Sequence, residues 1–114
     1  MPCLYYGDEE CLDGLRDPFN RAAFTPSGSG LHNYYKRLAE IRNNEPCMCS
    51  GCLSVKALSP DVILLTRELD GDKICCIVNR SDAAFPLPFS DAVPLLNGFA
   101  DILPAVSAEI YKFT

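Results

Sequence analysis

The fold of this chain is decided by residues 62–79, which read VILLTRELDGDKICCIVN. Two apolar runs, Val62–Leu69 and Ile74–Asn79, flank the segment Asp70-Gly71-Asp72. An Asp-Gly pair between apolar runs is the strongest local signal for a β-hairpin, because glycine readily adopts the positive φ that a tight turn requires. The segment therefore predicts two paired antiparallel strands.

Further short strands are expected on either side of this hairpin. The candidates are Cys52–Leu58, Ala83–Leu87, Ala92–Leu96 and Ser107–Phe113. Strands at roughly ten-residue spacing, separated by turn signals, suggest an antiparallel β-sandwich. Pro86, Pro88 and Pro94 should confine their segments to sheet edges or turns, because proline cannot donate a hydrogen bond to a neighbouring strand.

The first part of the chain has a different pattern. Residues 2–6, PCLYY, form a short apolar run closed by Gly7, which suits a strand buried on both faces. A long polar stretch over residues 8–30 follows, and loops of that length are usually functional or disordered. Residues 31–45 have apolar side chains at helical spacing, and Pro46 supplies the stop, so this segment is the clearest helix.

One strand and one helix cannot form a core. We therefore interpret residues 1–46 as the end of a larger α/β domain and residues 47–114 as a separate β-sandwich domain.

The composition argues against several classes of function. The chain has 114 residues and a net charge of −5, with no basic run, so we expect neither a nucleic-acid partner nor an anionic membrane surface. No stretch approaches the roughly 18 apolar residues of a membrane span. The start has no positively charged segment and turns acidic at Asp8, which is unlike a signal peptide.

Seven cysteines, an odd number, then favour reduced thiols and a cytoplasmic location. The adjacent Cys75 and Cys76 are interpreted as small apolar fillers rather than as a disulfide.

One block of the sequence resembles a known family. PCLYYGDEECLDGLRDPFNR, residues 2–21, is similar to the last barrel strand and following loop of glycoside hydrolase family 13, the α-amylase family, and above all to its neopullulanase and cyclomaltodextrinase branch. YYKRLAEIRNNEP looks like the final barrel helix. ICCIVNRSD and ILPAVSAEIYKF resemble the C-terminal sandwich that follows it. The resemblance covers essentially the whole chain.

The resemblance implies a mainly β chain: a C-terminal antiparallel β-sandwich preceded by a strand-loop-helix remnant of a (β/α)8 barrel. It further implies that the parent is a retaining enzyme that hydrolyses α-glucosidic bonds. The catalytic carboxylates of the family sit on barrel strands four, five and seven, so we expect none of them here and expect the chain alone to be inactive. Whether the chain itself counts as an enzyme stays open.

Asp17 and Arg21 are the candidate substrate-binding residues. In the resembled branch, the Asp and Arg of the Asp-Pro-x-x-Arg motif contact glucose units of the α-glucan or maltooligosaccharide. A carboxylate accepts hydrogen bonds from sugar hydroxyls and a guanidinium donates to them, which suits the role. The alternative is that Asp17 begins a turn and Arg21 pairs with a nearby acid.

Three other groups are interpreted as structural. Asp8, Glu9 and Glu10 could mimic a glycosidase acid pair, but no neighbouring residue would orient them, so we expect packing and loop contacts. Cys47, Cys49 and Cys52 could be soft zinc ligands, but they lack an obvious fourth ligand, so we expect neither metal nor cofactor. His32 is interpreted as a solvent-facing helix residue.

A second class of function stays open: a free-standing sandwich that binds α-glucan or a protein partner. Against it, the chain has no tryptophan, and the aromatic residues after residue 47 suit a core better than a sugar platform. The apolar residues before residue 45 should be exposed without a barrel around them. We therefore expect either a homo-oligomer through residues 1–45 or disorder of residues 1–30.

Overall fold

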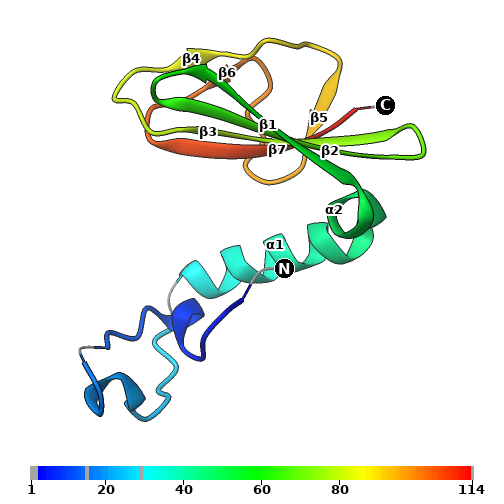
Figure 1. Cartoon of the computed structure of the whole chain (residues 1–114). Coiled ribbons are helices and arrows are strands. Elements are labelled where there is room, and N and C mark those ends of the chain that lie inside the picture. The colour runs from blue at the N-terminus through cyan, green and yellow to red at the C-terminus, as the bar shows by residue number, and fades with distance from the viewer. Residues whose placement is uncertain (1–2, 15, 29, 114) are drawn as a thin grey trace. The chain divides into compact units, whose positions relative to one another are not determined.

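The computed structural model describes residues 3–14, 16–28 and 30–113 (Figure 1). The chain forms two compact units, Met1–Glu40 and Ile41–Thr114, and each is described by itself. None of the helices among these residues is long and apolar enough to cross a membrane.

The second unit is built on antiparallel sheets, as expected. The main sheet has five strands in the order β1-β2-β3-β7-β5. Their bounds are β1 Cys52–Ser59, β2 Val62–Leu69, β3 Asp72–Asn79, β7 Ser107–Phe113 and β5 Ala92–Pro94. A second sheet of two strands pairs β4, Phe85–Pro86, with β6, Ile102–Leu103. The mainly β, sandwich-type fold class is confirmed.

The central hairpin forms where the sequence placed it. Strands β2 and β3 pair along their full length, from Val62 opposite Asn79 to Leu69 opposite Asp72. The two turn residues, Asp70 and Gly71, have φ values of 51° and 96°. Two consecutive positive φ values match the right-handed twist of the flanking strands, which is why Asp-Gly specifies this turn.

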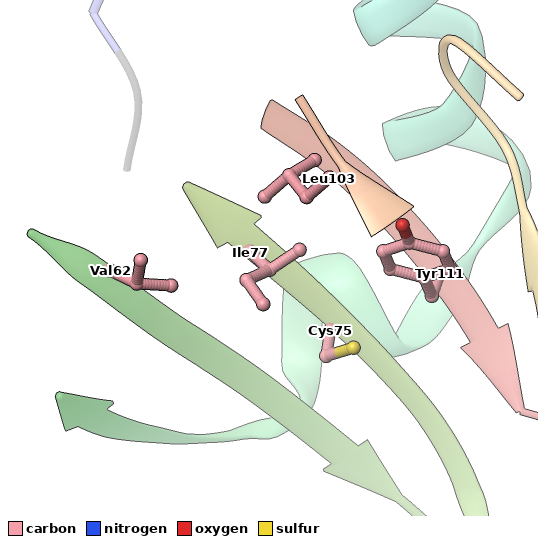
Figure 2. Packing of buried hydrophobic residues seen from close by; sticks show 5 residues of the cluster. All are labelled: Val62, Cys75, Ile77, Leu103 and Tyr111. Atoms are coloured by element: carbon pink, nitrogen blue, oxygen red, sulfur yellow. The ribbon is translucent and has the colours of Figure 1, made fainter. Parts of the chain in front are cut away.

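The core lies between the two sheets. Its buried residues are Val62, Cys75, Ile77, Leu103 and Tyr111, shown together in Figure 2. Leu103 comes from β6 and the others from β2, β3 and β7, so the small sheet covers one face of the large one. Cys75 is 1% exposed on this face while Cys76 is half-buried, and both thiols are free. The interpretation as an apolar filler is thus confirmed for Cys75.

Two buried polar side chains form hydrogen bonds with the segments that connect the strands of the sandwich. Asn79 donates to the carbonyl oxygens of Ala83 and Pro104, at 2.8 and 2.9 Å, and accepts from Ser81. Glu109, fully buried, accepts from backbone N–H groups in the segment 96–99. The short strands that proline interrupts therefore depend on side-chain hydrogen bonds where the ladders end.

The structure differs from the sequence prediction at the shortest elements. Strand β6 was not predicted, and β4 and β5 are shorter than the runs 83–87 and 92–96, in part because their prolines end the pairing. Pro46, expected only to stop the preceding helix, also opens a second helix, α2, Pro46–Ser50. Proline is suited to the first position of a helix because the N–H it lacks would have no partner there.

Helix α1, Gly30–Asn44, confirms the predicted helix over 31–45, and its residues up to Glu40 belong to the first unit. Two short 3₁₀ helices precede it, η1 at Asp8–Glu10 and η2 at Phe19–Arg21. The strand predicted over residues 2–6 is wrong for residues 3–6, which form coil and a turn, and Pro2 lies outside the described residues. A strand needs a hydrogen-bonded neighbour, and the described residues supply none for this run.

Candidate functional site

The loop between η1 and α1 carries the residues singled out from the sequence. It leaves a tight turn at Gly7, whose φ is 87° and whose carbonyl accepts from the N–H groups of Glu10 and Leu12, both at 3.0 Å. A side chain at this position would collide with Leu12. The carboxylate of Asp8 accepts from the N–H of Tyr5 at 3.0 Å. The turn thus sets the direction in which the loop leaves the apolar run.

Asp17 and Arg21 meet in this loop. Nε of Arg21 lies 3.1 Å from Oδ1 of Asp17, and the side chains are 73% and 67% exposed. The turn of η2 brings them together, since the N–H of Arg21 donates to the carbonyl of Pro18 at 3.1 Å. A carboxylate and a guanidinium lie side by side in solvent, where each keeps hydrogen-bonding capacity for a ligand.

The hydroxyl of Tyr6 lies next to the same segment. It contacts the carbonyl oxygens of Ala22 at 3.1 Å and Asn20 at 3.4 Å, the two neighbours of Arg21. A depression of about 280 Å³ lies here, lined by Tyr5, Tyr6, Asp8, Leu12, Asp13, Gly14, Asn20 and Ala22. Asp17 and Arg21 are not among these lining residues.

A third cluster was not predicted. Glu10, 6% exposed, accepts hydrogen bonds from the backbone and the hydroxyl of Ser27, both at 2.7 Å. Nδ1 of His32 lies 3.2 Å from the other carboxylate oxygen. His32 is exposed, as expected, but it has an acidic partner that the sequence did not reveal. The contacts of Glu10 confirm that this acid makes loop contacts.

The cysteines between the helices and the sheet have separate environments. The thiol of Cys47 is buried and donates to the carbonyl of Arg67 at 2.9 Å. Cys49 and Cys52 are exposed. Over the described ranges, no group of three His, Cys, Asp or Glu side chains is placed to hold a metal ion.

The fold of this chain is shared with solved structures of other proteins. An α-amylase from Anoxybacillus superposes with a TM-score of 0.84 over 95% of this chain and 28% of its own, at 24% identity. This likeness concerns the fold. No family model matches the chain.

Sequence comparison identifies relatives of this chain. A cyclomaltodextrin glucanotransferase of Paenibacillus macerans is 31% identical over 90 residues, which is 76% of this chain and 13% of that protein. One from Niallia circulans is 30% identical over 111 residues, 93% of this chain and 15% of that protein. The chain belongs to glycoside hydrolase family 13, the α-amylase family, as its motifs predicted. It spans only about an eighth of the curated relatives named here.

Proposed function

We propose that this chain is the C-terminal part of an enzyme that acts on α-glucans and retains the anomeric configuration. In support of the proposal, two relatives are named cyclomaltodextrin glucanotransferases. From the family resemblance, we expect the catalytic carboxylates on barrel segments that precede this one. The chain alone is then inactive. The β-sandwich has a structural role, and the first unit supplies one loop that contacts sugar.

The single observation that supports the sugar-contact role is the exposed Asp17–Arg21 pair, with Nε and Oδ1 3.1 Å apart. Neighbouring hydroxyls of a glucose unit can each donate to the carboxylate and accept from the guanidinium. The ion pair holds both groups in one orientation before the sugar arrives, so less side-chain freedom is lost on binding.

The experiment uses the complete protein that the source gene encodes. Asp17→Asn and Arg21→Gln should each raise KM for maltoheptaose about tenfold or more, since a hydrogen bond to a charged group contributes about 1.5–3 kcal/mol. The turnover number should fall less, because neither residue contacts the reacting atoms.

The sandwich offers a matched control. Asp61 and Arg80 form another exposed ion pair, with Nε and Oδ1 2.9 Å apart, in the second unit. Asp61→Asn and Arg80→Gln should leave KM unchanged. If the two sets of variants behave alike, the proposed role of Asp17 and Arg21 is wrong.

A further inference from the structure

One buried carboxylate joins the two ends of the loop that carries Asp17 and Arg21. Glu10 lies at the end of η1, directly before residues 11–26, and Ser27 directly follows these residues. Oε2 of Glu10 accepts from both the N–H and the hydroxyl of Ser27 at 2.7 Å, and the same hydroxyl lies 3.3 Å from the Glu10 carbonyl oxygen. These contacts close residues 11–26 at the base, and hydrogen bonds to an ionised acceptor are the strong ones.

His32 adds a contact from the first turn of α1. Its Nδ1 lies 3.2 Å from Oε1, the second oxygen of the Glu10 carboxylate. The hydrogen bonds from Ser27, and next the charge of His32, hold the pKa of Glu10 below its usual value. The carboxylate is therefore ionised at neutral pH and keeps its acceptor capacity.

A second side-chain contact to the loop, made by Tyr6, is more accessible to water. Tyr6, whose hydroxyl meets the carbonyls of Asn20 and Ala22, is 43% exposed, whereas Glu10 is 6% exposed. A buried hydrogen bond meets less competition from solvent than an exposed one. Of these two contacts, the one made by Glu10 is thus placed to restrain the loop more strongly.

We propose that Glu10 is a positioning residue, whose contacts with Ser27 fix the loop and thereby hold Asp17 and Arg21 ready for sugar. This inference rests on the proposed function, because sugar binding by Asp17 and Arg21 is the reason for holding the loop in place. Glu10 itself need not touch the ligand.

The test measures loop order by NMR in the 114-residue chain, without sugar. In Glu10→Ala, the backbone order parameters of the loop amides near Asp17 and Arg21 should fall from about 0.85 to below about 0.6. The Ser27 amide should exchange with solvent about tenfold faster, because its acceptor is gone. Glu10→Gln should stay close to wild type, since the amide oxygen still accepts from Ser27.

Two controls separate positioning from a general loss of structure. Glu68→Ala makes the same charge change in the other unit and should leave the loop unaltered. Ser27→Ala keeps the backbone hydrogen bond and should give an intermediate effect, with the amides of α1 unchanged. If Glu10→Ala leaves loop order as in wild type, or if Ser27→Ala disturbs α1 as much as the loop, the inference is overturned.

The outcome is independent of the kinetic test above. Unchanged loop order removes the positioning role and leaves the sugar-contact proposal standing. An unchanged KM in Asp17→Asn removes the sugar contact, whatever the order of the loop.

Discussion

The ammonium group of Lys112 lies 2.8 Å from Oε2 and 3.0 Å from Oε1 of Glu45. Lys112 belongs to β7, and Glu45 is the residue between α1 and α2. The pair thus links the residue between the two helices to strand β7 of the main sheet. The hydrogen bond to Glu45 raises the pKa of Lys112.

This pair predicts a pH-dependent stability. A lysine whose pKa is raised on folding stabilises the fold fully below its unfolded pKa, and the stabilisation is lost as pH rises through the folded value. Lys112→Gln should therefore lower the thermal midpoint at pH 7 by roughly 2–4 °C, and the difference should shrink in alkali. Scanning calorimetry across pH checks this, with the exposed Lys56→Gln as control. A difference that stays constant into strong alkali contradicts the assignment.

Glu109 should be more important for stability. Each of its two oxygens accepts from two backbone N–H groups, those of Leu96 and Ile110 on one and Asn97 and Phe99 on the other. In Glu109→Gln, the new NH₂ group must face two of these donors in either orientation. Leaving buried donors unpaired costs about 1–3 kcal/mol each, so we expect the free energy of unfolding measured in urea to fall by about 2–6 kcal/mol. Glu68→Gln, at an exposed carboxylate, should cost less than about 0.5 kcal/mol, and equal losses in the two variants would contradict this account.

The cysteines should differ sharply in reactivity. Burial in the core raises the pKa of Cys75 to about 12. At pH 8 only about one thiol in ten thousand is then ionised, and the thiolate is the reactive form. Iodoacetamide followed by peptide mass mapping should label the exposed Cys3, Cys11, Cys49 and Cys52 first. Cys75 should react only after unfolding. Labelling of Cys75 at the rate of Cys49 in the folded chain would contradict the burial of Cys75 in the core.

The isolated chain should self-associate through residues 1–45. Leu4, Tyr5 and Tyr6 are 66%, 56% and 43% exposed, and they line a groove of about 550 Å³ beside α1. Apolar patches of this kind favour association. Light scattering should give a mass above 12.5 kDa that falls to the monomer value in Leu4→Ser/Tyr5→Ser. Ile102→Ser, at an exposed residue of the sandwich, is the matched control, and a wild-type monomer at high concentration refutes the prediction.

The parts of the fold that the sequence predicted depend on local chemistry. The Asp70-Gly71 turn specified its hairpin because its φ values are a property of the two residues. Helix α1 followed from its apolar spacing. For Pro46, the sequence predicted the end of the preceding helix but not the start of α2, because the same proline that ends one helix can begin another.

The parts that were missed depend on contacts between distant residues. The Glu10–Ser27 and Lys112–Glu45 contacts join residues separated by 17 and 67 positions. No sequence periodicity relates residues so far apart, so the sequence around Glu10 or Glu45 did not indicate which residue each acid would contact. The Asp17–Arg21 pair was within reach of the sequence, because a short turn brings residues four apart together.

The central claim is that this chain is part of a retaining enzyme acting on α-glucans. The most direct measurement captures the native product from its source cells with an antibody to residues 47–114, and records its mass and its activity on maltoheptaose by NMR. We predict a protein much larger than 12.5 kDa whose newly formed products have the α configuration at the reducing end. A 12.5 kDa product without activity would contradict the account and would favour a free-standing module that binds α-glucan or a protein partner.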